Sequence, residues 1–271
     1  YLSRNLTAVN LGMELGEQAV IQEARSFGIT SPIPPYPSIY IGSADVYPLE
    51  MIASYGTFAT LGVRADPNAI LRVENAKGQV LWQPAPRRTQ VMTPDEAWVM
   101  VSMMKDVVQR GTAYNAVIGR GFRYPAAGKT GTTNDYTNVW FIGYTADLVA
   151  GVWMGFDQPK TIHSNAQGGS LAAPAWTAFM TEVYRRKPPP PDWPRPESVV
   201  VRQIDSRTGL LYTPSCVGGT IMTEYFVPGT EPREECVGYM PVRVARPPGI
   251  YSADSLNAAT LSPLQRTATP N

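Results

Sequence analysis

Histidine and cysteine are scarce in this chain of 271 residues: His163 is the only histidine, and Cys216 and Cys236 are the only cysteines. A structural zinc site usually needs about four such ligands, so no metal site is expected. His163 lies in a polar segment without a cysteine partner for acyl transfer, which favours a surface role. No cofactor is expected either.

The chain also lacks an excess of charge of one sign and long apolar runs. Its 23 Lys and Arg residues and 22 Asp and Glu residues are interspersed and give a formal net charge of +1, whereas a nucleic-acid partner needs a basic patch. No segment approaches the roughly 20 apolar residues of a membrane-spanning helix, and the N-terminus lacks the pattern of a signal peptide. The chain begins with Tyr1 rather than methionine, so we expect residues upstream, where any membrane anchor would lie.

Apolar residues make up 44% of the chain, enough for one substantial core and a minor module. Apolar residues recur at helical spacing in four segments. The best-marked helix begins at Thr93, a residue type that caps helices well, and has Pro94 at its first helical position. This helix stops at Gly111. The predicted helices are residues 11–27, which end at Gly28, and residues 48–61, 93–110 and 174–185.

Three pairs of segments are rich in the valine and aromatic residues typical of strands and flank short turns. Residues 69–74 and 79–82 predict a small inserted hairpin, and residues 138–144 and 148–156 predict a larger antiparallel hairpin. Residues 199–204 and 210–213 predict a third hairpin. The proline-rich residues 31–38 predict a loop.

A run of prolines, residues 188–191, divides the chain. Residues 1–185 are predicted to form the core domain, residues 186–196 a semi-rigid spacer, residues 197–240 a small β module and residues 241–271 a mobile tail rich in Pro, Ala, Ser and Thr. Cys216 and Cys236 both fall in the β module. We favour a disulfide, worth roughly 3 kcal/mol, because so small a module has little core; two thiols in a reducing compartment are the alternative.

Lys129, Thr130, Gly131 and Thr132 carry the chemical interpretation. At the start of a β-hairpin, a lysine, hydroxyls and a glycine present a cation, hydrogen-bond donors and an approachable backbone edge to a substrate carboxylate. The Lys-Thr-Gly triplet alone is common, so its neighbours matter. The accompanying motifs, in chain order, are Arg110-Gly-Thr-Ala, Lys129-Thr-Gly-Thr-Thr-Asn-Asp, Asn138-Val-Trp-Phe-Ile-Gly-Tyr, Val152-Trp-Met-Gly, Gly168-Gly-Ser-Leu-Ala-Ala-Pro-Ala-Trp and Gly229-Thr-Glu-Pro before Cys236.

This series of motifs resembles class A, bifunctional penicillin-binding proteins, from the first residues to about Cys236. Ser3 and Asn5 are similar to that family's second motif, in which the serine relays protons and the asparagine holds the substrate's amide. Helix capping is the alternative role for such residues. The resemblance implies an α/β (α+β) fold, an antiparallel sheet flanked by helices, truncated at its N-terminal side and followed by the small β module.

The family also requires a Ser-x-x-Lys motif, which puts the nucleophilic hydroxyl one helical turn from the lysine that takes its proton. We expect this motif upstream of Ser3, so the chain alone is predicted to be inactive. Ser102-Met-Met-Lys105 matches the pattern but lies between the second and third motifs. We interpret it as part of an ordinary helix.

The resemblance implies a serine D,D-transpeptidase that cross-links peptidoglycan stem peptides and binds β-lactams at the periplasmic or extracellular face of the cytoplasmic membrane. In that family Lys129 would supply positive potential, and Thr130 and Thr132 would bind the terminal carboxylate. Trp140 and Tyr144 are candidates for lining a groove. The alternative is a non-catalytic scaffold or binding subunit docked on a larger assembly. In both cases we expect a large interface with a protein partner near residues 1–30 and beside the hairpin of the Lys129 motif.

Overall fold

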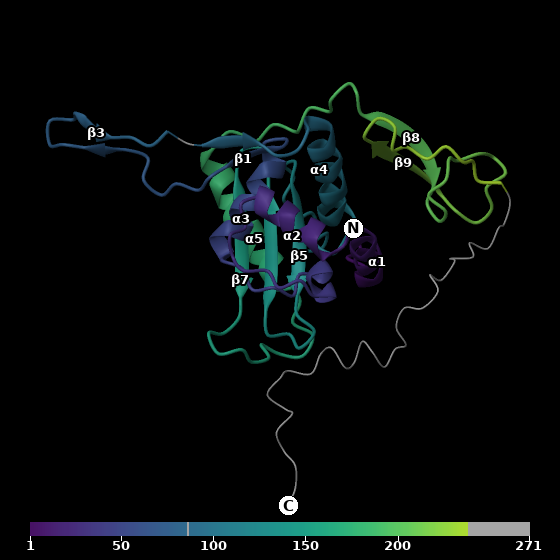
Figure 1. The fold of residues 1–271 in the computed structure, drawn as a ribbon, viewed down its shortest axis with the longest axis horizontal. Coiled ribbons are helices and arrows are strands. Elements are labelled where there is room, and N and C mark those ends of the chain that lie inside the picture. Colours follow the sequence, from purple (N-terminus) through teal and green to yellow (C-terminus); the bar gives the residue numbers. More distant parts are fainter. Residues whose placement is uncertain (86, 238–271) are drawn as a thin grey trace, which may run out of the picture. The chain divides into compact units, whose positions relative to one another are not determined.

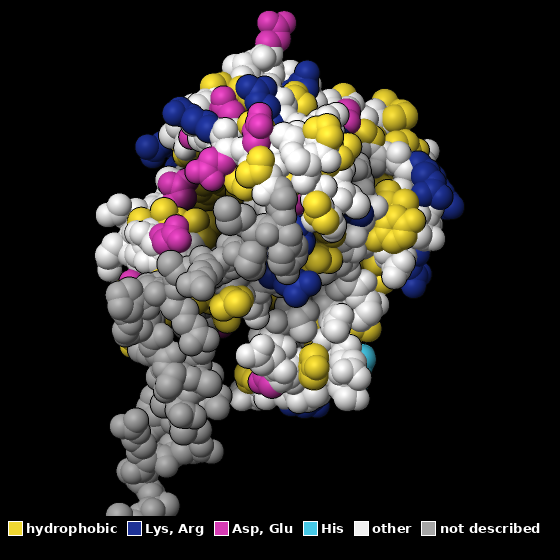
Figure 2. Space-filling view, turned by 90° about the vertical axis from the view of Figure 1, so that its right-hand side faces the viewer, with side chains coloured by type: hydrophobic (Ala, Val, Ile, Leu, Met, Phe, Trp, Pro, Cys, Tyr) yellow, Lys and Arg dark blue, Asp and Glu magenta, His cyan; other side chains and the backbone are white. Residues whose placement is uncertain are grey.

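The computed structural model describes residues 1–85 and 87–237 (Figure 1). The chain divides into two compact units. The first contains Tyr1–Arg202 and Thr223–Glu231, and the second contains Gln203–Met222 and, among the described residues, 232–237. None of the helices in the described part combines the length and the apolar character needed to cross a bilayer. Basic and acidic side chains are both present on the face shown in Figure 2.

A three-stranded antiparallel sheet lies at the centre of the first unit. Its order is β5 (Ala127–Thr132), β6 (Val139–Tyr144) and β7 (Val149–Met154). Lys129 of β5 is paired with Ile142 of β6, and Trp140 of β6 is paired with Trp153 of β7. The antiparallel hairpin predicted from residues 138–156 is therefore confirmed.

Helices cover both faces of this sheet. Successive side chains of a strand point to opposite faces, and on one face Phe141 packs against Trp176 of α5 (Ala172–Arg186), with 5.4 Å between ring centroids. On the other face Tyr144 lies 6.2 Å from Tyr55 of α3 (Pro48–Ala59). The predicted class of an antiparallel sheet flanked by helices describes this unit (Figure 1).

The helix α4 (Pro94–Gln109) begins as its sequence predicts. The side-chain oxygen of Thr93 accepts a hydrogen bond from the Glu96 backbone N–H at 3.3 Å, and the Thr93 backbone N–H donates to the Glu96 carboxylate at 2.8 Å. This capping box satisfies two N–H groups that have no partner within the helix. α4 packs beside β5, so the cap supports the strand that carries Lys129.

Two predicted helices have different bounds in the structure. The single helix predicted over residues 11–27 is two helices, α1 (Asn5–Leu15) and α2 (Glu17–Ser26), because Gly16 adopts φ 83° and ψ 154° and breaks the helical hydrogen bonds. Its predicted end is correct, since Gly28 adopts φ 91°. The helix α5 starts two residues before Pro174. A proline is tolerated in the first turn of a helix because the backbone N–H groups of that turn have no acceptor within the helix.

The shorter elements also belong to the first unit. A 3₁₀ helix, η1 (Pro37–Ile41), ends the predicted proline-rich loop. The strands β1 (Val63–Ala65) and β4 (Arg88–Gln90) pair with each other. The predicted inserted hairpin is present but shorter, as β2 (Val73–Glu74) and β3 (Val80–Trp82), and it projects outward in Figure 1.

The proline-rich residues 186–196 are not the spacer that their composition predicts. Trp193 is 5% exposed, and its indole Nε1 donates to the Ala59 carbonyl at 2.9 Å. Asp192 forms an ion pair with Lys105 of α4 at 2.7 Å. Burying the Trp193 indole against Tyr144 removes more apolar surface from water than an extended spacer would.

The strands β8 (Val200–Asp205) and β9 (Ile221–Phe226) form a two-stranded sheet, and the boundary between the units runs through both. The hairpin predicted between residues 199–204 and 210–213 is reduced to one antiparallel bridge, Ile204 with Leu211. Pro214 ends that segment because it has no N–H to donate. The predicted disulfide joins Cys216 to Cys236 in the second unit. The predicted tail, residues 241–271, lies outside the described residues.

Candidate active site

Lys129 lies on β5, and its ammonium group is the centre of the candidate site. Nζ donates hydrogen bonds to the Ser3 hydroxyl at 2.8 Å and to the Thr130 carbonyl at 2.6 Å. The side chain is largely removed from water, and this burial lowers the pKa of Lys129. Two residues that the sequence singled out, 126 positions apart, are therefore in direct contact.

Ser3 and Asn5 differ in their surroundings. Ser3 precedes α1 and adopts a left-handed backbone conformation, with φ 54°. Its hydroxyl meets Lys129 and does not cap the helix, because the N-cap residue is Arg4 and makes no side-chain capping bond. Asn5 is the first residue of α1, and its side chain is exposed. The structure brings Ser3, but not Asn5, into hydrogen-bond contact with Lys129.

The hydroxyls of Thr130 and Thr132 are held by neighbouring segments. The Thr130 hydroxyl is 2.8 Å from the Thr112 hydroxyl, which follows α4. The Thr132 hydroxyl accepts a hydrogen bond from the Gly168 backbone N–H at 3.1 Å, so its own proton is available to another acceptor. A Cβ at Gly131 would lie 3.1 Å from Trp140 Cβ, which makes glycine the best fit at this position.

A pocket of about 550 Å³ opens beside these residues. One wall consists of β5, β6 and β7, and the other consists of residues 41–46 and the start of α3. Trp140 and Trp153 lie in the first wall with 6.4 Å between ring centroids, and the Trp153 indole donates to the Asn138 side-chain oxygen at 2.9 Å. The pocket thus places an aromatic surface beside the Lys129 cation.

Trp140 lines the pocket as its position suggested, but Tyr144 does not. Tyr144 is fully buried, and its hydroxyl lies 3.6 Å from the sulfur of Met104 on α4. The prediction that it lines a groove is wrong because α4 and Trp193 cover this end of β6.

Several lining residues were not identified from the sequence. Thr112 lies in the Arg110-Gly-Thr-Ala motif, which the sequence identified as one of the family's motifs. The motif did not predict that Thr112 contacts Thr130. Residues 41–46 gave no comparable signal, because the strands they face lie about ninety positions further along the chain. Their glycine, Gly42, has φ 81° and ends η1.

The alternative nucleophile, Ser102, lies on α4 with Lys105. Lys105 Nζ donates to both carboxylate oxygens of Asp192, at 2.8 Å and 2.7 Å. The Lys105 ammonium group is thus directed to Asp192, which lies in the proline-rich segment after α5. This contact agrees with a structural role for the Ser102-Met-Met-Lys105 segment.

Two family models match this chain. The model of the penicillin binding protein transpeptidase domain matches residues 35–181, more than half of the chain. The chain belongs to this family. The model of the penicillin-binding protein 1A C-terminal domain matches residues 195–241, which include the small β module. The combination is that of a class A, 1A-like penicillin-binding protein.

Curated members of the family are similar over most of the chain. Penicillin-binding protein 1A of Aquifex aeolicus is 34% identical over 235 residues, covering 86% of this chain and 31% of that protein. Penicillin-binding protein 2D of Bacillus subtilis is 35% identical over 249 residues, covering 89% of this chain and 35% of that protein. The chain thus spans about a third of the length of these relatives.

Solved structures of the family have the same fold. The crystal structure of penicillin-binding protein 1A from Haemophilus influenzae has a TM-score of 0.78 at 24% identity and covers 88% of this chain and 40% of that one. PonA1 from Mycobacterium tuberculosis, in complex with penicillin V, has a TM-score of 0.58 at 25% identity and covers 70% of this chain and 56% of that one.

Proposed function

We propose that this chain forms the side of a serine D,D-transpeptidase site that binds the substrate carboxylate and relays protons. The observation that carries the proposal is the hydrogen bond between Ser3 and Lys129, which joins the second and third motifs in one place. The substrate would be the D-Ala-D-Ala end of a peptidoglycan stem peptide. β-Lactams would bind at the same place.

Each residue has a role that follows from its contacts. Lys129 provides positive potential, and the Thr130 and Thr132 hydroxyls donate to the terminal carboxylate of the substrate. Because burial lowers the pKa of Lys129, its ammonium gives up a proton more readily than an exposed lysine does, and Ser3 can pass that proton on. The Thr132 backbone N–H would help to stabilise the oxyanion, and Asn5 would hold the substrate's amide after a change in its side-chain conformation.

The acyl-accepting serine would come from a segment outside these 271 residues. Its hydroxyl attacks the carbonyl between the two D-alanines, the C–N bond breaks, and the terminal D-Ala leaves with the serine's proton. The amine of a second stem peptide then attacks the ester and releases the serine. The reaction needs no cofactor, and it would take place at the periplasmic or extracellular face of the cytoplasmic membrane.

A non-catalytic binding subunit is the second candidate function. It is favoured by the apolar side chains on α1, where Leu6 is 74% exposed and Leu15 is 58% exposed. A binding subunit would bury them against a separate protein partner that covers this helix.

Intact-mass measurement after incubation with a penicillin separates these functions. A transpeptidase gives one penicilloyl adduct on a species heavier than 29.6 kDa. An adduct on a chain of that mass, lost in a Ser102→Ala variant, would instead make Ser102 the nucleophile. Absence of any adduct on the heavier protein, while a control enzyme reacts, would favour the binding subunit.

A further inference from the structure

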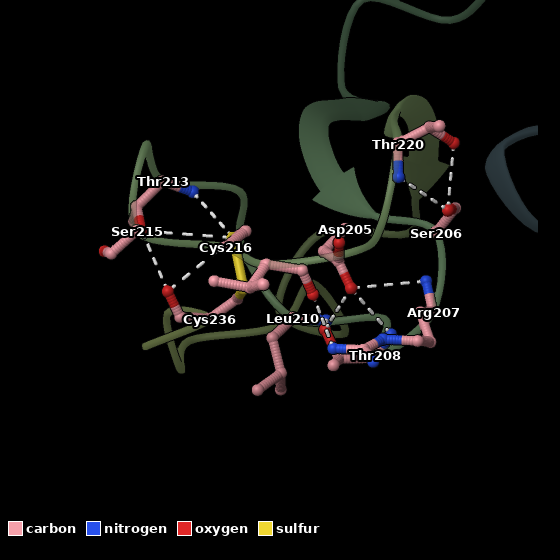
Figure 3. The surroundings of a disulfide bond; sticks show 11 residues. Asp205, Ser206, Arg207, Thr208, Leu210, Thr213, Ser215, Cys216, Thr220 and Cys236 are labelled. Carbon is pink, nitrogen blue, oxygen red and sulfur yellow. Dashed lines mark hydrogen bonds between the residues drawn. A yellow bond between two sulfur atoms is a disulfide. The ribbon is translucent and has the colours of Figure 1, made fainter. Parts of the chain in front are cut away.

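The second unit contains a cluster of three side chains around its disulfide: Asp205, Cys216 and Cys236 (Figure 3). A carboxylate oxygen of Asp205 and the two sulfur atoms all lie within 4.8 Å of one another. Asp205 is fully buried, and Cys236 is 3% exposed. The cluster is separate from the candidate active site and shares no residue with it.

The two carboxylate oxygens of Asp205 have different surroundings. Oδ1 accepts hydrogen bonds from the Arg207 backbone N–H at 3.2 Å and from the backbone N–H and hydroxyl of Thr208, both at 2.9 Å. Oδ2 is buried and has no hydrogen-bond partner among residues 1–85 and 87–237. A buried carboxylate oxygen without a partner is costly, so this arrangement suits a cation.

The hydrogen bonds from Thr208 and Arg207 also hold the Asp205 carboxylate in place. Gly219 leaves the space that Oδ2 occupies, since a Cβ there would clash with it. A carboxylate oxygen of Asp205 lies within 4.8 Å of both sulfur atoms.

The sulfur of Cys216 already has a feature that stabilises a thiolate. The Thr213 backbone N–H donates to it at 3.2 Å, and the turn that positions this donor is closed by the Cys216 N–H and the Thr213 carbonyl. Cys216 is half-buried whereas Cys236 is buried, so Cys216 is the more accessible residue of the pair.

We propose that reduction of the Cys216–Cys236 disulfide converts this cluster into a binding site for Zn²⁺ or a similar thiophilic divalent cation. A dithiol reductant supplies two electrons and two protons, is itself oxidised to a disulfide, and leaves two cysteine thiols. Binding of the cation releases both thiol protons and gives a site of two thiolates and Asp205 Oδ2, with water as the fourth ligand.

Such a site requires the two sulfur atoms to move apart once the bond between them is broken. Zn–S bonds of about 2.3 Å at a tetrahedral angle place the two sulfur atoms about 3.8 Å apart, and Zn–O bonds of about 2.1 Å place the oxygen at a similar distance from each. The Asp205 oxygen already lies within 4.8 Å of both sulfur atoms, and breaking the S–S bond lets the sulfur atoms separate. The scarcity of cysteine and histidine argued against a metal; the fold adds Asp205 as a third ligand.

Titration with Co²⁺, followed by competition with Zn²⁺, tests the proposal on the whole chain. The disulfide is first reduced without oxygen by a phosphine, which takes up oxygen from water. We expect one Co²⁺ per chain, with the near-ultraviolet absorption of a cobalt–thiolate bond, and no binding to the oxidised chain. Asp205→Asn should weaken Co²⁺ binding at least tenfold, whereas Glu234→Gln, an exposed acid of the same unit, should not.

Several outcomes would overturn the proposal: no binding after reduction, equal binding before reduction, or equal affinity in Asp205→Asn and the unchanged chain. Circular dichroism of each oxidised variant first establishes that it folds. If Asp205→Asn does not fold, the double variant Cys216→Ser and Cys236→Ser replaces it, and this variant must lose the cobalt signal. Retention of the signal there would place the metal elsewhere.

Discussion

Glu50 of α3 accepts hydrogen bonds from the backbone N–H and the hydroxyl of both Thr30 and Ser31. The bond from the Thr30 hydroxyl is the main cause that lowers the pKa of Glu50 to about 2, from an ordinary value of 4.5. These bonds join the loop after α2 to the start of α3, which lines the pocket. A single carboxylate thus fixes one wall of the candidate site.

The stability of the first unit should therefore depend on pH through Glu50. A carboxyl whose pKa is lower in the folded state stabilises the fold above its unfolded pKa, and that contribution is lost as the pH falls. We expect the loss to occur between about pH 4.5 and pH 2. The urea midpoint of the chain should fall more steeply in this range than that of Glu50→Gln, and equal slopes would contradict this account.

Thr132 is the residue at which carboxylate binding is most directly tested. Its hydroxyl accepts from Gly168 and keeps its own proton for the substrate. In a protein that contains the nucleophile, Thr132→Val should slow penicillin acylation by roughly 10–100-fold, the value of one hydrogen bond to a charged group. Thr132→Ser should retain most of the rate. Stopped-flow acylation kinetics measure both, and equal losses would point to a steric effect of the methyl group.

At the scale of the element, α4 joins local stability to the site. Its first turn carries the Thr93 capping box, and the segment after its last turn places Thr112 against Thr130 of β5. Thr93→Ala should lower the free energy of unfolding by about 1 kcal/mol, whereas Thr93→Ser should leave it nearly unchanged. Urea denaturation measures the difference, and an equal loss in both variants would rule out the hydroxyl as its cause.

The sequence predicted the elements whose signals are local. Thr93, Pro94 and Gly111 mark α4 because capping and termination depend on a few neighbouring residues. The break at Gly16 was missed, since a glycine within a helical pattern does not reveal whether its φ is positive. The pairing of β8 with β9 was missed because a nearer segment, residues 210–213, had the composition of a strand.

At the scale of the whole molecule, Trp193 connects the proline-rich segment to the sheet and α3. It packs against Tyr144 and donates to the Ala59 carbonyl, 134 positions away. Composition could not predict this, because Pro-rich segments are usually extended and solvated. The sequence identified Lys129 and Ser3 because they lie in motifs. It did not identify the pocket wall formed by residues 41–46, because composition does not reveal contacts between distant segments.

Trp193→Ala should lower the free energy of unfolding by about 3–5 kcal/mol, as expected for removal of a buried aromatic side chain. Trp82 of β3, which is 49% exposed, provides the matched control, and Trp82→Ala should change stability by about 0.5 kcal/mol or less. Denaturant unfolding followed by circular dichroism measures both. Similar small losses would mean that the proline-rich segment is detached in solution.

The hydrogen bond between Ser3 and Lys129 also determines when the site can form during synthesis. Its partners are 126 positions apart, and Thr132 depends on Gly168 still further along the chain. Contacts of such long range form late, because the intervening loop must be closed first. A nascent chain arrested before Gly168 would already contain β5, β6 and β7 but would lack the backbone N–H that holds the Thr132 hydroxyl, so its site would be incomplete.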